Sequence, residues 1–97
     1  MQPHVKWGGG NMYFMNICTW DPKDAKKVRE RRKKWKWPNK VKVMFEFLDL
    51  QGCRVINVLD TDERGLIASR AHWVDILKFE TFPIYPIGDT KKKLSLK

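Results

Sequence analysis

Hydrophobic and polar positions divide the chain into segments of two periods. Four short segments rich in aromatic and β-branched residues are typical of strands, and they cover residues 12–20, 41–50, 54–59 and 76–85. Two segments between them, at about residues 22–35 and 61–71, carry helix signals. The resulting order, β-α-β-β-α-β, predicts an α+β ferredoxin-like domain, in which two helices cover one face of a four-stranded antiparallel sheet.

Both helices are preceded by residues that favour a helix start. Asp21 is a good N-cap, and Pro22 suits a first helical turn because its missing N–H would have no partner there. Asp60, with Glu63 three residues later, has the spacing of a capping box, so we expect the second helix to begin near residue 61. Apolar residues predict the buried side of that helix, and they are Leu66, Ile67 and Val74.

The strands carry signals of pairing and position. Strict alternation in residues 41–50 would place Val41, Val43, Phe45 and Phe47 on one face, and Lys42, Met44, Glu46 and Leu48 on the other. Gln51-Gly52 predicts a tight turn into the next strand. Pro83 and Pro86 at the end of the last strand favour a sheet edge, because proline cannot donate a ladder hydrogen bond.

The predicted sheet is apolar on both faces. Strand 12–20 has Tyr13, Met15 and Ile17 on one side, and Phe14, Cys18 and Trp20 on the other. Soluble monomers avoid exposing an apolar patch of several hundred Å². A second copy of the chain could cover such a patch by burying about 800 Å² per partner. The pattern therefore predicts a homodimer.

A family resemblance rests on packing positions spread along the chain. The residues that carry it are Met12-Tyr13-Phe14-Met15, Arg31-Arg32, Trp73-Val74-Asp75-Ile76, Glu80 and Pro83. Residues 12–87 resemble a group of uncharacterised prokaryotic domains related to the dimeric α/β-barrel superfamily. The resemblance implies two sheets that face each other as a barrel with the helices outside. Outside this domain we expect a flexible tail at residues 1–11 and a basic, Lys-rich tail at residues 88–97.

The net charge of +9 belongs to one segment. Residues 22–42 contain eleven Lys or Arg and two acidic residues, while charges in the rest of the chain cancel. The predicted basic surface consists of Arg29, Arg31, Lys33, Lys34 and Lys36. It is either an ordinary solvated helix face or a docking surface for nucleic acid or acidic partners. Because residues 54–59 lack the aromatic side chains of an RNA-recognition strand, any such nucleic-acid binding is expected to be non-specific.

One arginine falls on the inner stripe of each predicted helix. Arg32 and Arg70 would bring two guanidinium groups near the sheet, which predicts a pocket for a small anionic ligand between helices and sheet. The candidate pocket residues are Asn16, Trp20, Arg32, Arg70, His72, Trp73 and Glu80. The alternative is that both arginines extend to solvent or pair with Glu46 and Glu80.

Catalytic and cofactor signals are weak. The resemblance implies a further alternative, a monooxygenase or haem-degrading enzyme, because Asn16, His72 and Trp73 have the residue types that such barrels use. We nevertheless expect a non-enzymatic domain without cofactor, and without metal since the His and Cys residues lack ligand spacing. No apolar run reaches membrane-spanning length, and two cysteines are too few for a disulfide scaffold, which favours a cytoplasmic location.

Overall fold

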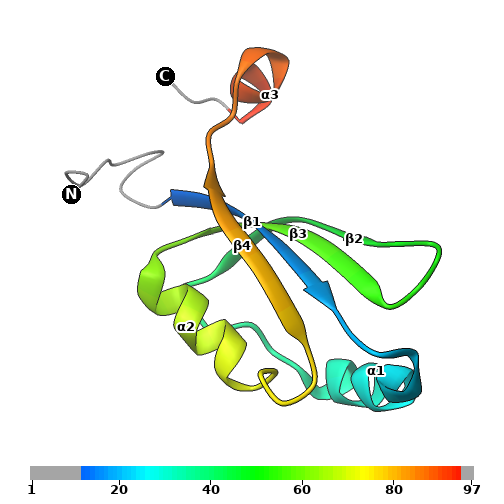
Figure 1. Cartoon of the computed structure of the whole chain (residues 1–97). Helices are drawn as coiled ribbons and strands as arrows, with labels where there is room; N and C mark the ends of the chain where they lie inside the picture. Colours follow the sequence, from blue (N-terminus) through cyan, green and yellow to red (C-terminus); the bar gives the residue numbers. More distant parts are fainter. Residues whose placement is uncertain (1–11, 95–97) are drawn as a thin grey trace.

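The computed structural model describes residues 12–94 (Figure 1). Its elements are β1 (Met12–Thr19), the short 3-10 helix η1 (Pro22–Asp24), α1 (Ala25–Lys34), β2 (Lys42–Leu48), β3 (Arg54–Thr61), α2 (Glu63–Ala71), β4 (Lys78–Ile84) and α3 (Gly88–Lys93). Asp21 caps η1 as expected, since its side chain accepts a hydrogen bond from the Lys23 N–H. The tail predicted for residues 1–11 lies outside the described residues.

The strands form one sheet in the order β2-β3-β1-β4, and every neighbouring pair is antiparallel. Helices α1 and α2 lie on the same side of this sheet (Figure 1). The predicted α+β, ferredoxin-like architecture is confirmed. β4 is an edge strand, so the N–H that Pro83 lacks is not missing from an interior ladder.

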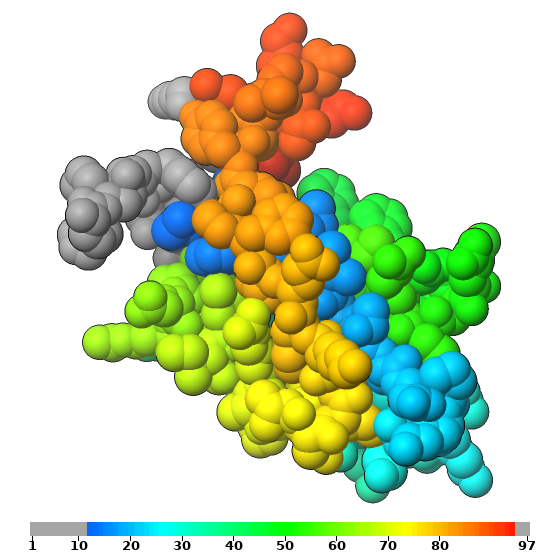
Figure 2. All heavy atoms as spheres, in the orientation of Figure 1, coloured from blue at the N-terminus to red at the C-terminus, as the bar shows by residue number. Residues whose placement is uncertain are grey.

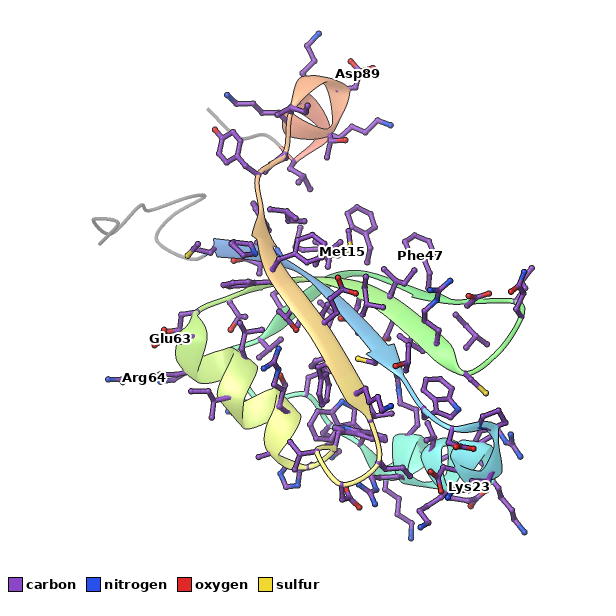
Figure 3. The ribbon with its side chains drawn as sticks, viewed as in Figure 1. Met15, Lys23, Phe47, Glu63, Arg64 and Asp89 are labelled. Atoms are coloured by element: carbon purple, nitrogen blue, oxygen red, sulfur yellow. The ribbon has the colours of Figure 1, made fainter. Side chains whose placement is uncertain are left out.

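Pairing registers divide the sheet into two faces. We call the side toward α1 and α2 the inner face and the opposite side the outer face. The inner face carries Phe14, Asn16, Cys18, Val55, Asn57, Leu59, Phe79, Thr81, Val43, Glu46 and Leu48. The outer face carries Met15, Ile17, Phe45, Phe47, Ile56, Val58, Phe82 and Ile84 at its centre. Met15 and Phe47 project away from the two helices in Figure 3.

The prediction that the side chains of β2 alternate strictly between the two faces of the sheet is wrong. The register shifts between Val43, which pairs with Leu59, and Phe45, which pairs with the adjacent Val58. The extra residue, Met44, makes a bulge that moves Val43 to the inner face while Phe45 stays on the outer face. A bulge leaves no mark on the apolar pattern of the strand, so alternation alone could not reveal it.

The start and the buried side of α2 also differ from the sequence prediction. β3 continues to Thr61, and the N-cap is Asp62, whose side chain accepts a hydrogen bond from the Gly65 N–H at 2.9 Å. The helix buries its small residues Gly65 and Ser69, while Ile67 is exposed. Small residues let the helix axis approach the sheet closely, which an apolar-residue count does not detect.

The C-terminal segment is partly ordered. Gly88–Lys93, predicted as part of a tail, forms α3, which projects beyond the end of β4 (Figure 2). A groove of about 260 Å³ separates α3 from the end of the outer face, and Tyr13, Phe45 and Ile87 are among its walls. Between residues 12 and 94, no helix combines the length and apolar character that crossing a bilayer requires.

Candidate functional site

A row of polar side chains crosses the inner face at one level. Asn16 of β1 pairs in register with Asn57 of β3 and Thr81 of β4, and Asn57 pairs with Glu46 of β2. Paired residues of neighbouring antiparallel strands point to the same face, so all four side chains lie side by side. We call Glu46, Asn57, Asn16 and Thr81 the polar row. Both asparagine side chains are buried, and the residues next to them along each strand are apolar.

Hydrogen bonds at one end of the polar row run in a fixed direction. The Arg70 guanidinium, which can only donate, bonds to the Thr81 hydroxyl at 2.5 Å. Thr81 therefore donates its own hydrogen to Asn16 Oδ1, at 2.7 Å. This turns Asn16 Nδ2 the other way, where its partner is the Cys18 sulfur at 3.4 Å.

The other end of the row is fixed by a carboxylate. Arg32 of α1 forms an ion pair with Glu46, and Asn57 Nδ2 donates to the second Glu46 oxygen at 3.3 Å. A carboxylate only accepts hydrogen bonds, so the Asn57 amide must present its NH₂ group to Glu46 and its oxygen away from it. Asn57 Oδ1 is buried and has no hydrogen-bond partner within residues 12–94.

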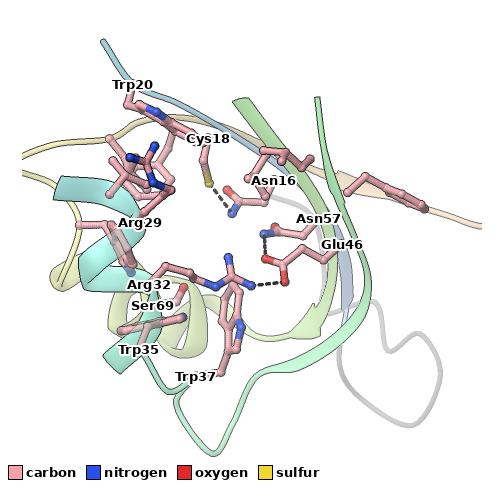
Figure 4. Close-up of a pocket in the computed structure, with 17 residues that line it drawn as sticks. Asn16, Cys18, Trp20, Arg29, Arg32, Trp35, Trp37, Glu46, Asn57 and Ser69 are labelled. Carbon is pink, nitrogen blue, oxygen red and sulfur yellow. Dashed lines mark hydrogen bonds and ion pairs between the residues drawn. The ribbon is translucent and has the colours of Figure 1, made fainter. Parts of the chain in front are cut away.

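A cavity of about 450 Å³ lies above the polar row, between the inner face and the two helices (Figure 4). All tryptophans of the described segment are in its walls, and they are Trp20, Trp35, Trp37 and Trp73. Trp35 contacts the rings of Trp37 and Trp73 edge to face, each at a centroid distance of 5.7 Å. Since aromatic edges and faces attract in this geometry, the cluster holds one wall together.

Two arginine side chains of α1 bring positive charge to the cavity wall. Arg29 and Arg32, one turn apart, both line it, as does Glu46 from the sheet. Arg32 is neutralised by Glu46, whereas Arg29 makes no hydrogen bond or ion pair to any described residue. The remaining walls are mostly apolar, with Val28, Leu48, Val55, Leu77 and Phe79. The cavity is thus an apolar chamber with excess positive charge on one side.

Arg31 ties α1 to the loop after α2. It makes two hydrogen bonds to the Asp75 carboxylate, at 2.7 and 3.0 Å, and one to the His72 carbonyl at 2.7 Å. Its guanidinium also lies 5.4 Å from the centroid of the Trp73 ring. The bonds from Arg31 lower the pKa of Asp75 below its usual value. The predicted basic-surface residue is in fact a structural clamp.

The cavity lining includes one thiol, that of Cys18. Burial, as the main cause, raises the pKa of the Cys18 thiol to about 11, so it stays protonated and unreactive near neutral pH. No group of three or more potential metal ligands occurs in the described part of the chain. The described lining therefore combines apolar walls with a few polar and charged side chains.

The structure brings most of the predicted pocket residues together. Asn16, Trp20, Arg32 and Trp73 line the cavity, and Arg70 reaches the polar row through Thr81. His72 and Glu80 do not belong to the lining.

His72 is exposed, and its ring lies 5.6 Å from the ring of Trp35. Glu80 projects from the outer face, since it pairs with Ile17. Glu80 therefore lies on the face of the sheet opposite the cavity, and His72 is the residue that follows the last turn of α2.

Sequence reasoning missed Asn57, Trp35 and Trp37 as pocket residues. A signal for Asn57 existed, because it is the one polar side chain inside the apolar run 55–59. On the predicted basic surface, Lys33 pairs with Glu30 at 3.3 Å, while Lys34 and Lys36 are exposed. Arg29 is exposed as well, and it also lines the cavity.

Fold and site together define a ferredoxin-like α+β domain with a ligand-sized chamber between its helix layer and its sheet. The chain belongs to a family described as a domain of unknown function, DUF3303, whose model matches residues 12–96. This confirms the expectation of an uncharacterised domain family. No curated protein and no solved structure matches the chain.

Proposed function

We propose that the protein is a homodimeric binding domain for a small anionic molecule with a planar apolar body. The observation that carries this proposal is the cavity of about 450 Å³ walled by four tryptophans and bordered by Arg29 and Arg32. Ligand pockets of roughly 300–1,000 Å³ with apolar walls and a few polar groups are typical of small-molecule sites. Indole faces favour flat, apolar ligands.

The sign of the ligand's charge follows from the side chains of α1. Arg29 is an unpaired cation, and Arg32 shares its charge with Glu46, so the cavity lining has a net positive charge. A carboxylate or similar anion would gain charge-assisted hydrogen bonds at the α1 side. A cationic ligand would meet Arg29 without compensation.

The outer face supports the homodimer. Phe45, Phe47 and Phe82 remain exposed there, and the rings of Phe45 and Phe47 stack 6.5 Å apart. Charged side chains such as Lys42, Glu80 and Lys78 lie around this aromatic centre, at the ends and edge of the sheet. An apolar centre with a polar rim is the usual anatomy of an interface between subunits. A second copy of the same face is the partner that we propose.

The geometry favours this proposal over the two other functions considered from the sequence. With His72 outside the cavity, a monooxygenase or haem-degrading role finds no histidine among the residues from 12 to 94 that line the site. Docking of nucleic acid through α1 loses Arg31 and Arg32 to intramolecular ion pairs. Arg29 and the exposed lysines of α1 are then the remaining contribution to such docking, and they need no specific partner.

The test is a titration of tryptophan fluorescence with 2-naphthoate. We expect saturable binding, and a loss of affinity of about three- to fivefold in Arg29→Gln because an exposed charge contact is worth up to ~1 kcal/mol. Uncharged 2-naphthamide should bind wild type and Arg29→Gln equally. Arg64→Gln, on the exposed side of α2, is the matched control and should bind like wild type.

Two results would overturn the proposal. One is the absence of saturable 2-naphthoate binding to the folded protein. The other is an equal effect of Arg29→Gln and Arg64→Gln, which would show that only overall charge matters.

A further inference from the structure

The cavity opens between α1 and the edge strand β2. Those of its described lining residues that are exposed to solvent all come from these two elements, and they are Arg29, Arg32, Phe47 and Leu48. Lining residues from β1, β3 and α2 are buried or half-buried, with Asn16, Asn57 and Ser69 among the buried ones. A ligand therefore enters between α1 and β2, and the interior of the cavity lies toward the sheet and α2.

The two arginines of this mouth stand on neighbouring turns of α1. Residues three positions apart are neighbours on a helix surface, with Cβ atoms about 5–6 Å apart. Arg29 has no hydrogen-bond or ion-pair partner among the described residues, so its long side chain is free to turn toward Arg32. A single anion at the mouth is then within reach of both guanidinium groups.

Arg32 keeps most of its hydrogen-bonding capacity although it belongs to an ion pair. A guanidinium carries five N–H donors on three nitrogens. Arg32 uses only Nη2, which binds Glu46, and its Nε and Nη1 have no partner within residues 12–94. The Arg32 side chain is 45% exposed, so a molecule at the mouth can reach it. Figure 4 shows it extending across the cavity from α1 to Glu46.

We infer that the anionic group of the ligand is a phosphate monoester, which stays at the mouth between Arg29 and Arg32 while the aromatic body enters the cavity. A carboxylate has two oxygens and is satisfied by one guanidinium fork. A phosphate monoester has three terminal oxygens and a charge of about −1.5 to −2 at pH 7, so it matches two guanidinium groups. The inference rests on the proposed function, because it uses the same cavity. It adds the class of the ligand, an aryl phosphate, and makes Arg32 a specificity-determining residue.

The charge of the surrounding segment favours such a dianion. Residues 22–42 contain eleven Lys or Arg and two acidic residues, and α1 lies within this segment. Glu46 offsets the charge of Arg32 alone. A phosphate at the mouth therefore lies in a positive field that extends along the whole helix.

Entry with the ring first limits what the aromatic group can be attached to. The ring would lie among interior walls that include the buried residues Ser69 and Trp73. Its end opposite the phosphate must then be free. A phosphotyrosine within a peptide, whose ring joins the backbone at that end, does not meet this condition. The ligand is a small molecule in which the phosphate marks the outer end.

Two matched probes test the inference in wild-type protein by isothermal titration calorimetry. They are 2-naphthyl phosphate, a monoester, and 2-naphthyl methyl phosphate, a diester with the same ring and only one charge. At pH 7 we expect the monoester to bind about tenfold more tightly, because charge-assisted bonds to a second guanidinium are open to it. At pH 5, below the second phosphate pKa of about 6, most of the monoester carries one charge and the preference should fall to about twofold. The diester, measured at each pH, accounts for changes in the protein itself.

Variants then assign the preference to Arg32. Arg32→Gln/Glu46→Gln removes the ion pair without changing the net charge, so the preference at pH 7 should fall to about threefold or less, the part that Arg29 supplies alone. The control is Glu30→Gln/Lys33→Gln, which removes another ion pair of α1 whose residues do not line the cavity. It should keep the tenfold preference. The wild-type comparison at two pH values decides the inference even if Arg32→Gln/Glu46→Gln does not fold.

The possible failures are distinguishable. If neither naphthyl ester nor 2-naphthoate binds the folded protein, the proposed function itself is wrong. If the two esters bind wild type equally at pH 7, or the preference is the same at pH 5 and pH 7, the cavity is a ligand site but the phosphate inference is overturned. A tenfold preference that survives in folded Arg32→Gln/Glu46→Gln would also overturn it, by removing Arg32 from the binding of the phosphate.

Discussion

Arg70, which bonds to one end of the polar row, and Glu46, which forms its other end, decide how the amides between them are oriented. Arg70 can only donate and Glu46 can only accept, so each fixes the direction of the next hydrogen bond inward. The hydrogen bonds that start from Arg70 and from Glu46 do not meet, and Asn57 Oδ1, which lies between them, has no partner among the described residues. The sequence predicted Asn16 and Arg70 as pocket residues, but Asn57 appeared to be an interruption in an apolar strand, and only the pairing register relates it to Asn16.

Gly65 provides a second residue-level constraint, the close approach of α2 to the sheet. A Cβ atom at this position would lie 1.9 Å from Thr61 Oγ1 and 3.1 Å from a methyl group of Val41. Thr61 is fully buried and donates to the Lys40 carbonyl at 2.9 Å, so it cannot rotate away freely.

We predict that Gly65→Ala lowers the free energy of unfolding by about 1–3 kcal/mol, despite the better helix propensity of alanine, because the added methyl overpacks the interface. Urea unfolding measures this change. Arg64→Ala, on the exposed side of the same helix, is the control and should change stability by less than ~0.5 kcal/mol. A Gly65→Ala protein as stable as wild type would show that α2 is not held as closely as described.

Helix α1 is separated from the inner face by the cavity and is held mainly at two points. Arg31 binds Asp75 and the His72 carbonyl after α2, while Arg32 reaches across to Glu46 on β2. Val28 is the buried residue of the helix. This arrangement explains how a chamber can persist beneath α1, because long charged side chains bridge a gap that short apolar ones would close.

The clamp predicts a pH dependence. Arg31 lowers the pKa of Asp75 in the folded protein, so the pair stabilises the fold above the unfolded pKa of about 4, and this contribution disappears as pH falls through the lowered folded pKa. Wild type should therefore be more stable than Asp75→Asn at pH 7, and the two should converge as pH falls below the unfolded pKa of about 4. Thermal unfolding across this range measures both. Parallel curves would mean that the ion pair contributes nothing to holding α1.

The order of elements was predictable, and its details were not. Aromatic and β-branched runs separated by Asp-Pro and Gln-Gly signals sufficed for β-α-β-β-α-β, and the prolines placed β4 at an edge. The bulge at Met44, the N-cap at Asp62 and the small buried face of α2 depend on tertiary contacts that no local pattern contains. Which side chains meet in the cavity depends on those same contacts.

At the scale of the whole molecule, the two faces of the sheet have different requirements. Helices α1 and α2 cover the inner face and leave the cavity between themselves and the sheet. The outer face, in contrast, exposes Phe45, Phe47 and Phe82 to solvent. The helix α3 reaches only the end of the outer face, where Tyr13 is buried. A binding domain that works as a dimer through this face would keep both ligand chambers on its outside, open to solvent.

Sedimentation velocity in the presence of 2-naphthoate, recorded also at a wavelength that only naphthoate absorbs, tests this account most directly. The proposed homodimer predicts one species of twice the chain mass of 11.6 kDa that carries the naphthoate signal, and a ligand-bound monomer for Phe82→Glu, since Phe82 lies on the outer face and does not line the cavity. Leu50→Glu, in the fully exposed turn, should remain a dimer. A wild-type species of single chain mass at micromolar concentration, or a dimer that sediments without naphthoate, would contradict it.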